Sequence, residues 1–265
     1  MALYQAVLAY DGTDFLGFQR QSRGRTVQGE VEKALRRLGW AEKSILAAGR
    51  TDSGVHARGQ VIAFGLDWRH DEASLMRALN SLLPPEVVVR ELRLAPDGFH
   101  PRYDALARRY VYRLFFAPLR NPFAERFAWR VWPPADEDLL ARAAALLPGR
   151  RDFSAFGTPP RPNGTTIRTV RLARWRRIAP QAWAFEVAAD AFLYRMVRRM
   201  VGLQVLIGQG RRSFEELEQA LKSPPANPLA VLAPPNGLFL ESVCYTPEDL
   251  ARCESAKIAP QGLLF

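Results

Sequence analysis

The order of apolar patterns along the first hundred residues limits the folds open to this chain. Strand-like and helix-like patterns follow one another at residues 3–10, 28–38, 45–48, 60–64, 72–83 and 87–94. The two helical segments carry apolar residues at spacings of three, four and seven, which places them on one helix face. Gly39 and Pro84-Pro85 end these segments. The order strand, helix, strand, strand, helix, strand predicts a split βαβ, or ferredoxin-like, unit.

The second half of the chain repeats this order loosely. Its predicted strands and helices lie at residues 109–116, 136–147, 167–178, 182–189, 192–207, 213–221 and 238–245. The similarity lies in the order of elements and not in a residue-level repeat. We therefore predict an α+β fold of two similar halves, at residues 1–103 and 104–245, followed by a tail at 246–265.

The charge of the chain is large and uneven. The net charge is +10, and 33 of the 37 basic residues are arginine. Residues 1–103 carry 14 basic and 12 acidic groups, residues 104–245 carry 21 and 12, and the tail has a net charge of −1. A basic surface concentrated in one half favours a polyanionic partner, most plausibly nucleic acid. A basic membrane-surface helix is disfavoured because the arginines are scattered over many segments, and no apolar run approaches the roughly 20 residues that span a bilayer.

Several motifs that bind cofactors or metals do not occur. There is no P-loop and no G-x-G-x-x-G, the three histidines are far apart, and the two cysteines match no zinc spacing. We expect no cofactor and no metal, and two ordinary thiols at Cys244 and Cys253. The first residues have neither a basic nor an apolar stretch typical of a secretory signal, which predicts a cytoplasmic protein.

One polar, glycine-rich segment at residues 47–57 lies between two short apolar runs. Asp52 is the only carboxylate between Glu42 and Asp67. A nearby arginine or backbone amides would keep it ionised, as a nucleophile must be. The alternative is an Asx-turn residue that organises a β-hairpin. The residues alone leave both readings open.

Residues 49–57, Gly-Arg-Thr-Asp-Ser-Gly-Val-His-Ala, resemble the G-R-T-D-[AS]-G-V-H-A signature of the tRNA pseudouridine synthase I (TruA) family. Further similar segments extend along nearly the whole chain, at residues 10–19, 26–30, 99–102, 108–112, 192–202 and 233–240. The departures include Ser53, where the family more often has alanine, and Tyr194-Arg195, where histidine is common. Neither departure falls on a residue with an expected chemical role.

The resemblance implies a fold and an activity. The two halves would join into one mixed, mainly antiparallel sheet with a central cleft. The enzyme would isomerise uridine to pseudouridine at positions 38, 39 and 40 in the anticodon stem-loop of tRNA, without a cofactor. It would be a homodimer with tRNA as its partner.

The resemblance also implies roles for four residues. Asp52 would be the catalytic aspartate, acting on the sugar either by covalent attack or by proton abstraction. Tyr110 would stack on the target uracil, although Tyr110 and Tyr112 point to the same side of a strand. Arg198 would form an ion pair with Asp52, and Arg50 would help to flip the target base.

Without the resemblance, the residues alone predict less about the roles of the arginines near position 198. They indicate phosphate contacts for Arg195 and Arg199 and leave Arg198 undecided. They also favour a close backbone approach at Gly202, because glycine in the middle of a helix lowers helix stability.

Two rival functions would use the same basic surface. One is a catalytically silent RNA-binding module on the same fold, and the other is an RNA chaperone. Neither needs the carboxylate of Asp52, so a requirement for Asp52 separates them from an enzyme.

The charge distribution predicts salt-dependent binding of tRNA. If about six phosphates are contacted, affinity falls roughly a thousandfold between about 50 and 200 mM salt, because bound counterions are released. A salt titration of binding to labelled tRNA measures this slope. A flat profile would contradict a basic RNA-binding surface.

Overall fold

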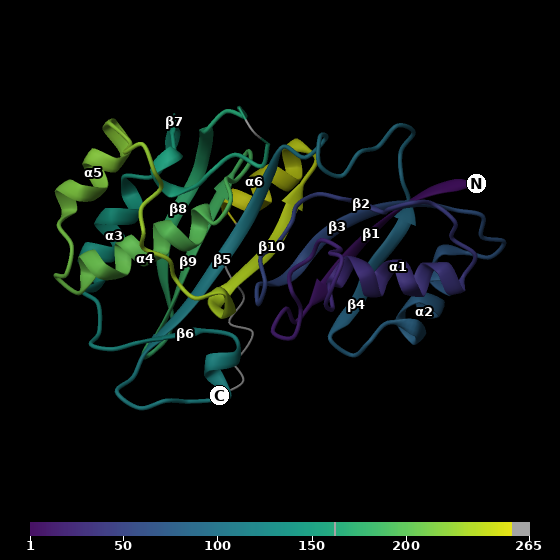
Figure 1. Cartoon of the computed structure of the whole chain (residues 1–265), viewed down its shortest axis with the longest axis horizontal. Coiled ribbons are helices and arrows are strands. Elements are labelled where there is room, and N and C mark those ends of the chain that lie inside the picture. Colours follow the sequence, from purple (N-terminus) through teal and green to yellow (C-terminus); the bar gives the residue numbers. More distant parts are fainter. Residues whose placement is uncertain (162, 256–265) are drawn as a thin grey trace. The chain divides into compact units, whose positions relative to one another are not determined.

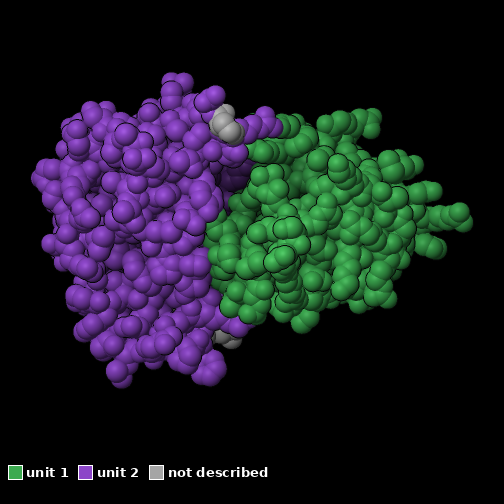
Figure 2. Space-filling view, in the orientation of Figure 1, with its two compact units in different colours: residues 1–106, 239–245 green, residues 107–238, 246–265 purple. Residues whose placement is uncertain are grey.

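The computed structural model describes residues 1–161 and 163–255. It divides into two compact units (Figure 2). Unit 1 contains Met1–Leu106 and Phe239–Tyr245, and unit 2 contains Ala107–Leu238 and the segment from Thr246. Each unit combines helices with a mainly antiparallel sheet (Figure 1). The predicted α+β class is confirmed.

Unit 1 is built in the predicted order. Its elements are β1 (Ala2–Tyr10), α1 (Val27–Arg37), β2 (Leu46–Ala47), β3 (His56–Leu66), α2 (Glu72–Leu82) and β4 (Val87–Leu94). The strands lie in the order β4-β1-β3, with β2 on the outer side of β3, which is the arrangement of a split βαβ unit. Thr26 and Asp71 cap the two helices by accepting hydrogen bonds from Gly29 N and Ser74 N.

Two short strands share the outer side of β3. β2 pairs antiparallel with Ile62 and Ala63, and β10 (Leu238–Cys244) pairs parallel through Phe239 and Leu240 with the first two residues of β3. The pairing of β10 brings a segment from the end of the chain beside residues 56–57. It therefore supports the end of the polar segment that contains Asp52.

Unit 2 contains a sheet in the order β5-β9-β8-β7. Its strands are β5 (Ala107–Phe116), β6 (Trp129–Val131), β7 (Gly149–Asp152), β8 (Ile167–Ala179) and β9 (Ala182–Ala189), and β6 pairs parallel with β5. Its helices are α3 (Glu137–Ala145), α4 (Met196–Gly208), α5 (Phe214–Lys222) and α6 (Pro247–Ser255). Every residue of β5 and β9 is buried.

The strands β6 and β7 and the helix α6 have no counterpart in the sequence-based prediction. Ser213 caps α5 by accepting a hydrogen bond from Glu216 N. In contrast, α4 begins four residues later than predicted, because Arg195 has a left-handed backbone conformation with φ of 64°.

The state of the two cysteines differs from the prediction. The expectation of two thiols is wrong, because Cys244 and Cys253 are both disulfide-bonded. Within the described residues, no helix is long and apolar enough to cross a membrane.

One buried carboxylate in unit 2 holds three arginines. Glu186 on β9 is fully buried. Its oxygens lie 2.9 Å from Arg109 Nη2, 2.9 Å from Arg174 Nη2 and 2.8 Å from Arg176 Nε. The guanidinium of Arg109 is itself nearly inaccessible, so the carboxylate beside it offsets part of the cost of burying its charge.

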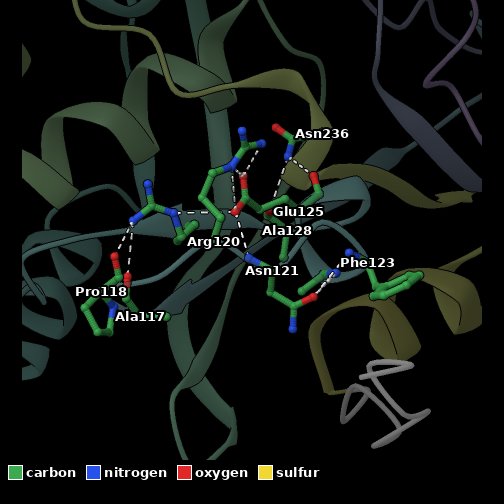
Figure 3. A network of polar contacts seen from close by, with 10 residues as sticks. Ala117, Pro118, Arg120, Asn121, Phe123, Glu125, Ala128 and Asn236 are labelled. Atoms are coloured by element: carbon green, nitrogen blue, oxygen red, sulfur yellow. Dashed lines mark hydrogen bonds and ion pairs between the residues drawn. The ribbon is translucent and has the colours of Figure 1, made fainter.

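A second network fastens the segment between β5 and β6 (Figure 3). Glu125 accepts from Arg120 and from the amide of Asn121, and it also lies 3.5 Å from Arg130. The side chain of Asn236 donates to the carbonyls of Glu125 and Ala128. These bonds connect residues 120–130 to the segment before β10.

The Glu186 cluster generates a stability prediction. Glu186→Gln removes the carboxylate that lies 2.9 Å from the buried guanidinium of Arg109, and we expect a loss of about 3 kcal/mol or more in the free energy of unfolding. Urea unfolding of the variant measures the loss. The matched double variant Glu186→Gln, Arg109→Met also removes the buried positive charge and should regain part of that stability. Equal stability of the single variant and the unchanged chain would contradict this role.

Candidate active site

The loop that contains Asp52 is braced by the loop after β1. The hydroxyls of Thr51 and Tyr10 lie 2.8 Å apart, and the amide of Phe18 donates to Thr51 O. On the other side of Asp52, the carbonyl of Phe15 accepts from the amide of Gly54 and from Ser53 Oγ. Residues on both sides of Asp52 are therefore held, while Asp52 itself is partly exposed.

Two glycines allow this close packing of backbones. A Cβ on Gly12 would lie 2.0 Å from Val55 O, and one on Gly17 would lie 2.7 Å from Thr51 O. Gly17 also has a φ of 93°, which favours glycine. The requirement for glycine at both positions follows from the loop opposite them and is not visible in the local sequence pattern.

The ring of His56 supports the same region. Nδ1 of His56 lies 3.0 Å from the amide nitrogen of Gly12 and 3.1 Å from Asp11 Oδ1. A single ring nitrogen cannot accept a hydrogen bond from the Gly12 amide and also donate one to Asp11 Oδ1. Because the Gly12 amide always carries a hydrogen, we assign Nδ1 as an acceptor and do not count the Asp11 contact as an ion pair. The ring is buried and stacks on Phe239 of β10, with centroids 4.7 Å apart.

Arg50 precedes the braced part of the loop. Gln60 on β3 donates to the carbonyl of Gly49 at 2.9 Å, which holds the backbone directly before Arg50. The side chain of Arg50 is exposed. The structure thus places a fixed backbone and an accessible guanidinium two residues before Asp52.

The two tyrosines of β5 have different surroundings. Tyr112 is fully buried, and its hydroxyl donates to Pro234 O at 2.8 Å. Burial raises the pKa of Tyr112 well above the usual value for a phenol, so this side chain stays neutral. Tyr110 is 9% exposed and packs edge-to-face against Phe192, with centroids 4.9 Å apart.

Arg198 on α4 is also buried, and it is joined to the segment before β10. Its Nε donates to Ala233 O at 2.8 Å, while Ala233 N donates to Arg198 O. A Cβ on Gly202 would lie 2.6 Å from Val231 Cγ1 and 3.1 Å from Ala233 N. The close backbone approach predicted at Gly202 is confirmed.

Arg199 has carbonyl partners within unit 2. Its side chain donates to the carbonyls of Leu229, Phe156 and Tyr194. These bonds give Arg199 a structural role, in addition to the phosphate contact that the sequence predicts.

The predicted site residues are divided between the two units. Arg50 and Asp52 lie on one loop of unit 1, and Tyr110 and Arg198 lie on β5 and α4 of unit 2. The residues that brace the Asp52 loop, Tyr10, Thr51 and Phe18, have no role in the sequence-based prediction. The sequence signals for them were the family-like segments at residues 10–19, which contain Tyr10 and Phe18, and 49–57, which contain Thr51.

The bracing generates a structural prediction. Gly12→Ala forces the Asp52 loop away from residue 12, and overpacking of this kind costs about 1–3 kcal/mol. We expect a lower melting temperature and faster hydrogen exchange at the amides of Phe18 and Gly54. Ser22→Ala, in an exposed part of the same loop, is the control and should change neither quantity. Unchanged exchange in Gly12→Ala would show that the two backbones are not in contact.

Comparison with known proteins agrees with the pattern of residues. A family model described as tRNA pseudouridine synthase matches residues 6–104 and 143–246. The chain is 38% identical over 250 residues to tRNA pseudouridine synthase A of Syntrophotalea carbinolica, with 94% of this chain and 98% of the relative covered. It is 37% identical over 247 residues to tRNA pseudouridine synthase A of Pseudothermotoga lettingae, with 92% and 100% covered.

Solved structures similar to this chain include a Cbf5-Nop10-Gar1 complex. The match has a TM-score of 0.36 and 15% sequence identity, and it covers 76% of this chain and 45% of that one. This chain thus spans less than half of that longer chain, and nothing about its function is concluded from so distant a similarity. The family model and the relatives decide the assignment: the chain belongs to the tRNA pseudouridine synthase family, whose members are enzymes that isomerise uridine to pseudouridine.

Proposed function

We propose that this enzyme modifies uridines 38, 39 and 40 in the anticodon stem-loop of tRNA, with Asp52 as its catalytic nucleophile. The observation that carries the proposal is the nine-residue signature at residues 49–57, whose aspartate lies on a loop braced on both sides. Such bracing suits a catalytic group, because a reacting atom must be held in a fixed position.

The reaction is an isomerisation that needs no external atoms. The N1–C1′ bond of uridine breaks, the uracil turns, and a C5–C1′ bond forms while the hydrogen on C5 is lost and N1 gains one. Asp52 either attacks the sugar covalently or removes a sugar proton to give a glycal, and both routes need its carboxylate ionised. The target base must first leave the stack, at a cost of about a few kcal/mol.

Tyr110 is proposed to stack on the target uracil and is a candidate general base. Its neighbour Tyr112 is fully buried and uses its hydroxyl to hold Pro234 O. Because the Tyr112 hydroxyl is already used in this hydrogen bond, Tyr110 is the better candidate for the tyrosine of β5 that takes part in the reaction. Its place on a fully buried strand provides the rigidity that stacking requires.

Arg198 is proposed to pair with Asp52 and keep it ionised. A buried guanidinium needs an acidic partner, and the bond from Nε to Ala233 O fixes its position. This pairing belongs to the proposal that the halves 1–103 and 104–245 join one sheet and share a central cleft, with 246–265 as a tail.

Arg50 is proposed to assist base flipping. Its exposed side chain follows a backbone position that Gln60 holds, and a flat guanidinium can enter the space that a flipped base leaves. The enzyme is further proposed to act as a cytoplasmic homodimer on tRNA.

Asp52→Ala tests the proposed chemistry. We expect loss of pseudouridine formation, because no other carboxylate lies in the signature loop, with tRNA affinity largely kept. Pseudouridine mapping of a bulk tRNA pool, with and without protein, measures both the loss and the positions modified. Unchanged product would eliminate Asp52 as the nucleophile, and product at positions other than 38, 39 and 40 would overturn the proposed site on tRNA.

A further inference from the structure

Tyr194 presents an aromatic ring to solvent from a firmly held backbone. Its amide donates to Thr158 O at 2.9 Å, in an isolated antiparallel bridge between these two residues. Its carbonyl accepts from Arg199 Nη1 at 3.2 Å. The side chain is nevertheless 50% exposed. The amide and the carbonyl of Tyr194 are both hydrogen-bonded, so the backbone that carries the exposed ring is held in place.

The next residue has a strained backbone. Arg195 has φ of 64° and ψ of 11° at the start of α4, a conformation that disfavours residues with a Cβ. Glycine or asparagine would adopt it more easily. Strained positions of this kind persist where the surroundings impose them, and they gather at functional sites.

The side chain of Arg195 covers the tyrosine. Its Cζ lies 4.7 Å from the centre of the Tyr194 ring, which is a cation–π arrangement. Its Nε is buried and, in the part of the chain that the structure describes, has no hydrogen-bond partner. A strained backbone and an unpaired donor both disfavour arginine here on grounds of stability. Its presence therefore points to a task other than holding the fold.

We propose that Tyr194 and Arg195 form a stacking position for an unpaired nucleotide of the RNA substrate. A nucleobase would stack on the exposed tyrosine ring, while the guanidinium would supply positive charge to the phosphate beside it. The net charge of +9 on residues 104–245 suits such a polyanionic ligand. The inference rests on the proposed function, since it takes tRNA as the substrate.

The proposal predicts substrate binding without a part in the chemistry. Stacking on Tyr194 lowers KM for tRNA, and its loss should leave kcat unchanged. A merely structural pair would instead change the melting temperature.

The test compares four variants of the full chain by fluorescence anisotropy with a labelled tRNA transcript at several salt concentrations. Tyr194→Ala should weaken binding about fivefold or more, with the salt slope unchanged. Tyr194→Phe keeps the ring and should bind like the unchanged chain. Arg195→Gly should weaken binding and reduce the salt slope by about one, with a melting temperature equal to or above that of the unchanged chain.

Phe123→Ala is the matched control, because Phe123 is an exposed aromatic of the same unit (Figure 3). It should leave the affinity unchanged. The proposal is overturned if Tyr194→Ala binds normally, if Phe123→Ala weakens binding as much, or if Arg195→Gly lowers the melting temperature.

Pseudouridine formation by the unchanged chain separates this inference from the proposed function. Product formation together with normal binding by Tyr194→Ala would overturn only the stacking position. Binding that depends on Tyr194, without any product, would overturn only the proposed function.

Discussion

The backbone of residues 51–55 passes so close to Gly12 and Gly17 that no side chain fits between the two loops. This contact holds the chain on both sides of Asp52, and the hydroxyl pair of Tyr10 and Thr51 adds a bond from the end of β1. A catalytic carboxylate must be both accessible and fixed. Here the neighbours of Asp52 are buried or bonded, and Asp52 itself is partly exposed, which meets both conditions.

The arginines of unit 2 serve two purposes. Some are structural: Arg109, Arg174 and Arg176 surround the buried Glu186, and others bind backbone carbonyls. Guanidinium groups with such partners already contribute to holding the fold of the unit. The net charge still favours a polyanion, but the number of arginines overstates the number of phosphate contacts. Arg195 differs, because neither its backbone conformation nor its Nε benefits the fold.

The segment before β10 connects several parts of unit 2. Arg198 binds Ala233, Tyr112 binds Pro234, and Asn236 holds the carbonyls of Glu125 and Ala128. A Cβ on Gly237 would lie 2.5 Å from Arg113 O. Pro234 lies outside the strands, so its carbonyl accepts the side-chain bond from Tyr112 in place of a ladder bond. The sequence similarity at residues 233–240 thus has a physical basis in packing.

The sequence by itself determined the class of fold, most strands and helices, and the signature at residues 49–57, because apolar periodicity and local capping depend on neighbours along the chain. It missed the late start of α4, where Tyr194 forms a bridge with the distant Thr158 and Arg195 takes a left-handed backbone conformation. Only the tertiary structure decided that β10 pairs with the start of β3, which residues brace Asp52, and which tyrosine of β5 is fully buried. These features join residues far apart in the chain, and a local pattern carries no information about which distant backbone will lie opposite it.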